Sequence, residues 1–219
     1  MLPVQNSPKV IGFDLDQTLY PKSPEIDDAI QTYLYDKISY HLKVPRAEAQ
    51  RRFKELYHGA GISGSQSLLR LGIPNAKDTI QEALEKANIA EYLQPDPQTL
   101  SLLKNIKQKY GHIDIVTGSN RSNTLKKLTH MAIPAELFKH VITASDGPKS
   151  DGTTYRLWLS KYPQYSPDQF LYIGDRAASD YYSPRELGIK TILVYVNKSE
   201  SGIDCPQLKT LKDIATILL

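Results

Sequence analysis

The sequence predicts an α/β fold in which a Rossmann-like, parallel five-stranded sheet has helices on both faces and carries an inserted all-α helical cap. Five short apolar runs recur along the chain of 219 residues. They are continuous rather than alternating, as expected for strands that are buried on both faces. Helical patterns lie between most of these runs, which is the rhythm of parallel strands joined by crossovers. Residues 21–95 show helical patterns only, which predicts a separate helical insertion.

The core domain is predicted to comprise residues 1–20 and 96–219. Its candidate strands are Val10–Phe13, His112–Val116, His140–Thr143, Phe170–Ile173 and Thr191–Val196. Apolar residues at spacings of three and four predict helices between and after these strands. The predicted helices are Leu100–Tyr110, a segment through Leu125, Leu128 and Met131, Tyr155–Leu159, and the terminal Gln207–Leu219. Gly111, directly after the first of these helices, is the expected C-cap.

The helical cap is predicted at residues 21–95. Helical spacing of apolar residues indicates segments at Ile26–Leu42, Pro45–Tyr57, Gln66–Leu71 and Ile80–Ala87. Pro95 and Pro97 then interrupt the helical pattern, because a proline disfavours helical backbone in the residue before it. This proline pair marks the expected return to the core domain.

Composition and charge limit the classes of function. The chain has 27 Lys and Arg residues against 24 Asp and Glu residues, and the basic residues are scattered, so no nucleic-acid partner is expected. The basic stretch Arg46–Lys54 is interleaved with acidic residues, which is typical of a solvated helix face. No apolar run approaches the roughly 20 residues that span a bilayer, so no membrane partner is expected. The single cysteine, Cys205, and an N-terminus without a basic and apolar leader pattern predict a cytoplasmic location. Nothing in the sequence predicts the oligomeric state.

Two carboxylates follow the first candidate strand. Asp14 and Asp16 are separated by one residue, so in extended backbone both side chains point the same way at the end of the sheet. Like charges at this separation coexist at neutral pH when a cation binds both or when one carboxyl keeps its proton. Either condition is typical of a catalytic site. The alternative is that the two residues only form a turn, where aspartate is common.

Polar residues also follow three of the other strands, at the edge where open parallel sheets bind ligands. Thr117 and Gly118 precede a helix whose N-terminal N–H groups can bind an anion, Lys149 supplies a single cation, and Asp175 and Asp180 add two carboxylates. Each has a purely structural alternative. Thr117 can cap the helix, Lys149 can be a solvated loop lysine, and the two aspartates can be turn and helix-start residues.

In this order the motifs resemble those of the haloacid dehalogenase superfamily. That family has DxDxT after its first strand, then Thr or Ser, then Lys, then GDxxxxD. This chain has Asp14-Leu15-Asp16-Gln17-Thr18, Thr117, Lys149 and Gly174–Asp180 in the same order. The helical insertion is similar to that of the C1-cap subgroup, and residues 14–23, DLDQTLYPKS, resemble its pyrimidine 5'-nucleotidase-type branch. Gln17, Gly118-Ser119 and Ser150 depart from the Asn, Asn-Ala and Pro that are usual in that branch.

The resemblance implies a magnesium-dependent phosphatase that acts on a small phosphorylated metabolite, such as a nucleoside 5'-monophosphate. In this family the first aspartate forms an aspartyl-phosphate, which is the role implied for Asp14. Asp16 is then the general acid and base, a role that requires a raised pKa. Mg²⁺ is expected on the carboxylates of Asp14 and Asp175 and on the backbone carbonyl of Asp16, with Asp180 orienting its water ligands.

The resemblance also implies the groups that bind the phosphate. Thr117 and the Gly118 N–H are implied as donors to phosphoryl oxygens. Lys149 is implied as a catalytic and phosphate-binding cation that offsets the negative charge around Asp14.

Several alternatives remain open. The same core residues suit a sugar-phosphate or phosphoglycolate phosphatase, or a phosphomutase. A haloacid dehalogenase displaces halide from carbon and needs no acid at Asp16, so Asp16 and the pair Asp175 and Asp180 argue against it. The alternative of another class is an inactive binding protein with the same fold. Such a descendant is expected to have lost a charged site residue, and none is missing here.

Overall fold

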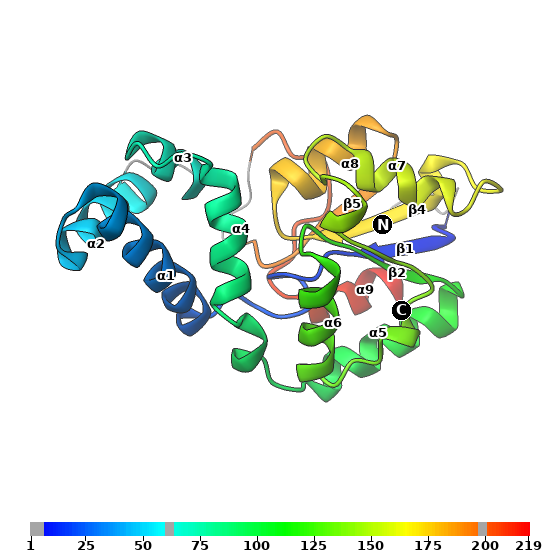
Figure 1. The fold of residues 1–219 in the computed structure, drawn as a ribbon. Coiled ribbons are helices and arrows are strands. Elements are labelled where there is room, and N and C mark those ends of the chain that lie inside the picture. Colours follow the sequence, from blue (N-terminus) through cyan, green and yellow to red (C-terminus); the bar gives the residue numbers. More distant parts are fainter. Residues whose placement is uncertain (1–6, 60–63, 197–200) are drawn as a thin grey trace. The chain divides into compact units, whose positions relative to one another are not determined.

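The computed structural model describes residues 7–59, 64–196 and 201–219. The chain divides into two compact units, which Figure 1 shows as ribbons. The first unit is Met1–Pro21 together with Leu93–Leu219, and the second is Lys22–Tyr92. The second unit is helical and interrupts the first, where the sequence predicts the cap at 21–95.

A parallel five-stranded sheet forms the centre of the first unit. Its strands are β1 (Val10–Phe13), β2 (Ile113–Val116), β3 (Val141–Ile142), β4 (Phe170–Gly174) and β5 (Lys190–Leu193). They are ordered β3-β2-β1-β4-β5, and every pairing is parallel. The predicted fold class is therefore confirmed. The strand β1 lies in the middle, so the segment that follows it has a neighbouring strand end on each side.

Helices cover both faces of this sheet, as predicted. In Figure 1, α5, α6 and α9 lie on one face, and α7 and α8 lie on the other. Their bounds are α5 Pro97–Tyr110, α6 Arg121–His130, α7 Thr153–Ser160, α8 Ser183–Glu186 and α9 Ala215–Leu218. A π-helix, Ala177–Tyr182, and short 3-10 turns at Ala135–Leu137, Ala144–Asp146, Pro167–Gln169 and Leu211–Ile214 complete the unit.

Local sequence sets the ends of α5. The Asp96 carboxylate accepts a hydrogen bond from the Gln98 N–H at 3.0 Å, and Pro97 occupies the first turn, where its missing N–H costs nothing. Gly111 ends the helix with φ of 81°, a left-handed conformation that glycine adopts without steric strain. The predicted C-cap is therefore confirmed.

The C-terminal helix is shorter than predicted. The sequence predicts a helix over Gln207–Leu219, but helical backbone begins only at Leu211. The Thr210 N–H donates to the Asp213 carboxylate at 2.8 Å, in a capping box that starts the helical turn there. Gln207 instead forms a parallel bridge with Leu193, which extends the edge of the sheet. Backbone pairing with the sheet edge therefore replaces the helical conformation that the apolar spacing predicts for this part of the segment.

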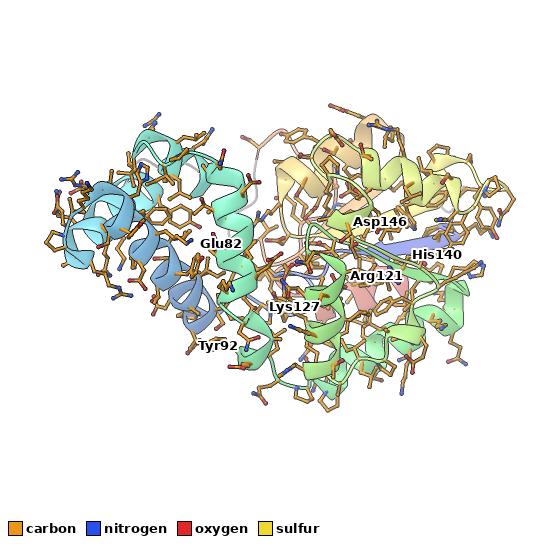
Figure 2. The ribbon with its side chains drawn as sticks, viewed as in Figure 1. Glu82, Tyr92, Arg121, Lys127, His140 and Asp146 are labelled. Atoms are coloured by element: carbon orange, nitrogen blue, oxygen red, sulfur yellow. The ribbon has the colours of Figure 1, made fainter. Side chains whose placement is uncertain are left out.

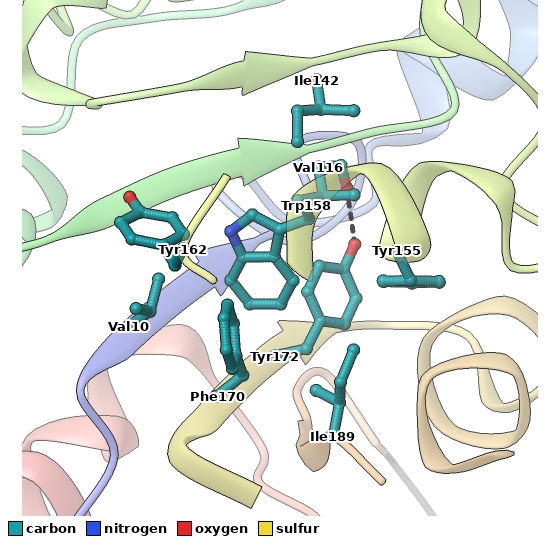
Figure 3. Packing of buried hydrophobic residues seen from close by; sticks show 9 residues of the cluster. All are labelled: Val10, Val116, Ile142, Tyr155, Trp158, Tyr162, Phe170, Tyr172 and Ile189. Carbon is teal, nitrogen blue, oxygen red and sulfur yellow. Dashed lines mark hydrogen bonds between the residues drawn. The ribbon is translucent and has the colours of Figure 1, made fainter. Parts of the chain in front are cut away.

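An aromatic cluster fills the space between α7 and the sheet (Figure 3). Trp158 is fully buried and packs edge-on against Phe170 and Tyr172, with ring centroids 5.0 and 6.0 Å away. Its indole ring lies directly over Gly12, where an added Cβ would come within 2.6 Å of two ring carbons. The Tyr172 hydroxyl donates to the Val116 carbonyl at 2.6 Å and so joins β4 to the end of β2.

A buried carboxylate anchors the same cluster. Asp114 lies within β2 and is fully buried. The sequence alone does not show which groups bind this carboxylate. It accepts hydrogen bonds from Trp158 Nε1 at 2.8 Å, from the Tyr162 hydroxyl at 2.7 Å and from the His140 N–H at 2.7 Å. Three donors satisfy the charge, so Asp114 links α7 and β3 to the centre of the sheet.

The second unit consists of α1 (Pro24–Leu42), α2 (Arg46–Lys54), a π-helix (Glu55–Gly59), α3 (Gly64–Arg70), α4 (Ala76–Lys86) and a 3-10 turn (Ile89–Tyr92). Buried apolar residues of these helices, Leu34, Tyr35, Ile38, Phe53 and Leu68 among them, form its own core. The basic face of α2 is compensated within the helix, since Arg51 and Arg52 both bind Glu48. Among the described residues, no helix combines the length and the apolar character needed to cross a membrane.

Candidate active site

The ends of β1 and β4 carry a compact group of charged side chains. Asp14 directly follows β1, and its N–H donates to the Ile173 carbonyl at 2.8 Å. Lys149, from the loop before α7, places Nζ 2.9 Å from Asp14 Oδ1 and 2.7 Å from Asp180 Oδ1. All three side chains are buried. Burial acts to lower the pKa of Lys149, and the charges of Asp14 and Asp180 reverse this effect and raise it.

Asp180 organises the loop that follows β4. Its Oδ2 accepts the backbone N–H groups of Asp175 and Arg176 at 3.0 and 2.9 Å, while its Oδ1 receives Ser179 Oγ and Lys149. An added Cβ on Gly174 would lie 2.4 Å from the Asp180 carboxyl, so glycine is required for this close approach. The π-helix that begins at Ala177 brings Asp180 back over the strand end. Both of its oxygens bind protein donors.

Three carboxylates of this group fit a divalent cation. Asp14, Asp175 and Asp180 each have a ligand atom within 4.8 Å of the others. Asp175 Oδ1 is buried without a hydrogen-bond partner, and such an atom is expected to have a ligand. Hard oxygen donors of this kind suit Mg²⁺.

Burial and repulsion from neighbouring carboxylates raise the pKa values of two of these aspartates, Asp14 and Asp175. Burial raises the pKa of Asp14 to about 6, with Lys149 opposing the shift and Asp180 and Asp16 adding repulsion. Burial together with repulsion from Asp14 and Asp180 raises the pKa of Asp175 to about 7. The protein alone therefore does not fully compensate the negative charge at this strand edge.

Asp16 belongs to a second, adjacent network. Its Oδ1 accepts a hydrogen bond from Lys127 Nζ at 2.5 Å and one from the Tyr20 hydroxyl, and its Oδ2 accepts one from the Ser119 hydroxyl. Burial acts to raise the pKa of Asp16, but the Lys127 charge and these hydrogen bonds outweigh it, so the pKa is lowered. The expectation of a raised pKa at Asp16 is wrong for the free protein, because Lys127 compensates the carboxylate.

Thr117 and Gly118 lie at the end of β2, next to β1. Thr117 is fully buried, and its Oγ1 accepts the Ser119 N–H at 3.2 Å, so it stabilises the turn that leads into α6. The helix itself is capped by Asn120, whose side chain accepts the Asn123 N–H at 2.9 Å. Thr117 is therefore not the N-cap. Gly118 is exposed, and no heavy atom lies within 4 Å of where a Cβ would be, so its backbone is open to a ligand.

The structure thus places every predicted site residue at the carboxyl edge of the sheet. It brings Asp14, Lys149, Asp175 and Asp180 together, and it joins Asp16 to the Thr117 turn through Ser119.

Sequence reasoning missed Lys127, which lies on α6 (Figure 2). A signal for it exists. Thr124, Lys127, Leu128 and Met131 share helical spacing and are all buried, so the inward stripe of α6 includes the lysine.

The chain belongs to the haloacid dehalogenase-like hydrolase family, whose model matches residues 11–194. The residues that resemble the family's four motifs lie at one edge of its sheet.

Individual proteins that this chain resembles share about a quarter of its residues over the matched segments. A glyceraldehyde 3-phosphate phosphatase from Pyrococcus abyssi is 26% identical over 191 residues, which are 84% of this chain and 80% of that protein. Phosphate metabolism protein 8 from Saccharomyces cerevisiae is 28% identical over 134 residues, 59% of this chain and 41% of the yeast protein. The crystal structure of a HAD phosphatase from Thermococcus onnurineus has a TM-score of 0.68 at 23% identity and covers 96% of this chain and 97% of its own.

Proposed function

We propose that the protein is a magnesium-dependent phosphatase that hydrolyses a small phosphorylated metabolite through an aspartyl-phosphate at Asp14. The observation that carries this proposal is the arrangement around Asp14. A buried carboxylate at the end of the central strand is held by the Lys149 ammonium and lies near two further carboxylates from the segment that follows β4. Phosphoryl transfer needs a positioned nucleophile and compensated charge. Lys149 supplies part of that compensation, and a bound divalent cation is proposed to supply the rest.

Asp14 is the proposed nucleophile. Its backbone is fixed by the hydrogen bond to β4 and its carboxylate by Lys149, so little reorganisation precedes attack. The carboxylate attacks phosphorus, the bond to the leaving oxygen breaks, and water then hydrolyses the aspartyl-phosphate to free phosphate and Asp14. Thr117 and the Gly118 N–H are the proposed donors to phosphoryl oxygens.

Asp16 is the proposed acid and base of the two half-reactions. A bound phosphate dianion adds negative charge beside Asp16 and increases its proton affinity, so the carboxylate takes up a proton from solvent and can donate it to the leaving oxygen. After the proton has left with the alcohol, the carboxylate accepts a proton from the hydrolytic water. The lowered pKa of Asp16 in the free protein keeps it ionised between turnovers.

The carboxylates of Asp14 and Asp175, with the backbone carbonyl of Asp16, are the proposed magnesium ligands. Both oxygens of Asp180 accept hydrogen bonds from protein donors. We therefore propose that Asp180 holds the loop that carries Asp175 and orients the water ligands of the ion. When bound, the ion supplies positive charge next to the transferring phosphoryl group.

Two substrate classes have support. Relatives named glyceraldehyde 3-phosphate phosphatase match most of this chain, which supports a short sugar phosphate. The string DLDQTLYPKS resembles the pyrimidine nucleotidase-type branch, which supports a nucleoside 5'-monophosphate. A panel of glyceraldehyde 3-phosphate, phosphoglycolate, UMP, CMP and AMP discriminates these classes by relative kcat/KM.

Phosphate release from p-nitrophenyl phosphate tests the reaction itself. We expect activity with Mg²⁺, loss of activity with EDTA, and a decrease of at least about 10³-fold in Asp14→Asn, because a nucleophile is removed. Asp78→Asn, an exposed carboxylate of α4, is the matched control and should leave the rate unchanged. Undiminished hydrolysis in Asp14→Asn contradicts the proposal. Recovery of a phosphorylated isomer rather than free phosphate identifies a phosphomutase.

A further inference from the structure

Lys127 is a buried lysine that the phosphatase mechanism above leaves without a role. Its side chain is 3% exposed, whereas the neighbouring Lys126 on the same helix is exposed. Among the described residues, Lys127 and Lys149 are the two lysines that are buried. Burying an ammonium group is costly unless its partners compensate the lost hydration. The partners of Lys127 therefore indicate what the residue does.

Both partners of Lys127 lie at the candidate active site. Its Nζ is 2.5 Å from Asp16 Oδ1 and 2.9 Å from Ser119 Oγ. The Ser119 hydroxyl donates in turn to Asp16 Oδ2, and the Tyr20 hydroxyl donates to Oδ1. Each oxygen of the Asp16 carboxylate thus has a fixed donor, and rotation of the carboxylate would break these hydrogen bonds.

Stability alone gives a weak reason for this lysine. A buried ion pair is often no more stabilising than apolar residues of similar volume, and the inner stripe of α6 is otherwise suited to a leucine or methionine. The pair instead resolves the repulsion between Asp14 and Asp16. Lys149 compensates Asp14, Lys127 compensates Asp16, and each ammonium comes from a different element of the fold.

We propose that Lys127 is a positioning residue that, with Ser119, holds the Asp16 carboxyl in the orientation for proton transfer to the leaving oxygen. This inference rests on the proposed phosphatase function and adds a residue to it. Lys127 itself does not contact the substrate. Its effect is exerted through Asp16, so it should matter in proportion to how much the leaving group needs a proton.

The test compares two substrates that differ in this need. An alkyl phosphate that the wild type hydrolyses in the panel above expels a strongly basic alkoxide, whereas 2,4-dinitrophenyl phosphate expels a phenoxide that departs without a proton. The measured quantity is kcat/KM, which includes expulsion of the leaving group but not later hydrolysis of the aspartyl-phosphate.

We expect Lys127→Met to lower kcat/KM at least about 100-fold for the alkyl ester, which is the usual range of general acid catalysis, and by less than about 5-fold for the dinitrophenyl ester. Lys127→Arg keeps the charge and should recover most of the loss. Ser119→Ala should show a smaller loss with the same substrate preference. Lys126→Met is the matched control on the exposed face of α6 and should match the wild type with both esters.

Equal losses with the two esters, or no loss in Lys127→Met, overturn the inference and leave the phosphatase proposal intact. Activity that survives Asp14→Asn overturns the phosphatase proposal and this inference with it. Urea denaturation of each variant separates a folding defect from a catalytic one. If Lys127→Met does not fold, the substrate preference in Ser119→Ala decides, and its absence there overturns the inference.

Discussion

Lys149 Nζ lies 2.7 Å from Asp180 Oδ1, and both side chains are removed from solvent. The same ammonium also contacts Asp14 and so compensates two buried carboxylates at once. A charge with two buried partners is expected to be needed for folding, because its removal leaves like charges without compensation.

Lys149→Met should therefore lower the free energy of unfolding by about 3–5 kcal/mol, as expected when one partner of a buried ion pair is removed. Urea denaturation measures this change. Lys161→Met, at the exposed end of α7, is the matched control and should change stability little. The double variant with Asp180→Asn should recover part of the loss. A Lys149→Met protein as stable as the wild type would show that the pair is already solvated.

The stability of the metal-free protein should depend on pH through Asp175. Burial and the repulsion from Asp14 and Asp180 raise the pKa of Asp175 to about 7, compared with about 3.9 in an unfolded chain. Between these values the folded state binds more protons than the unfolded state, so the free energy of unfolding falls as pH rises. Asp175→Asn removes this contribution.

In EDTA, we therefore expect the stability of Asp175→Asn relative to the wild type to increase from about pH 4 to about pH 7 and to level off above that range. Urea denaturation across this range measures it. Asp78→Asn should show no such trend, and a difference that is constant with pH would be evidence against the raised pKa.

Magnesium should stabilise the folded protein. Each ion that binds the folded state alone adds RT ln(1 + [Mg²⁺]/Kd), or about 2.7 kcal/mol at a hundredfold excess over Kd. We expect Tm to rise with Mg²⁺ in the wild type and in Asp78→Asn, and to stay constant in Asp175→Asn. This readout needs no substrate. An equal rise in all three proteins would place the ion elsewhere.

Gly12 is required by its contact with Trp158. An added Cβ would lie 2.6 Å from two carbons of the indole ring, and the buried ring has no room to move. We expect Gly12→Ala to reduce stability by at least about 1–3 kcal/mol, the usual cost of overpacking a core. Gly118→Ala, where a Cβ meets no atom within 4 Å, is the control for stability and should be neutral in urea denaturation.

Gln17 occupies a backbone conformation that suits another residue. Its φ is 57°, in the left-handed region, and its Oε1 is buried without a hydrogen-bond partner. Asparagine tolerates this region better than glutamine. Gln17→Asn should therefore increase stability by about 0.5 kcal/mol or more, within the cost of a left-handed residue. Gln17→Ala keeps the strained φ and should not show the gain. A gain of equal size in both would implicate the side-chain amide instead of the backbone.

The sequence predicts the sheet well because its strands are short, continuous apolar runs. Burial on both faces leaves no polar alternation in them, and all five appear where predicted. Two predicted bounds are wrong: the last strand ends at Leu193 instead of Val196, and the terminal helical turn begins at Leu211 instead of Gln207. The parallel bridge between Leu193 and Gln207 in this region is a tertiary contact. Local periodicity does not contain that information.

The sequence predicts the site residues that follow strands but not Lys127, which lies within a helix. Residues that follow strands, such as Asp14 and Asp175, are visible because parallel strands end at one edge. Lys127 sits inside a helix, and a lysine is usually exposed, so composition argues against its burial. Its partner Asp16 is 111 residues away in sequence, and only the fold shows that they meet.

The position of β1 between β2 and β4 has a consequence for how the chain acquires activity. Phe13 is aligned with Ile115 on one side and with Ile173 on the other. A slip of one residue at either pairing would move Asp14 by about 3.3 Å and turn its side chain to the opposite face. Misaligned molecules would therefore lack the proposed nucleophile at the site and be inactive instead of slow. The specific activity of a preparation should then report the fraction of chains with correctly paired strands.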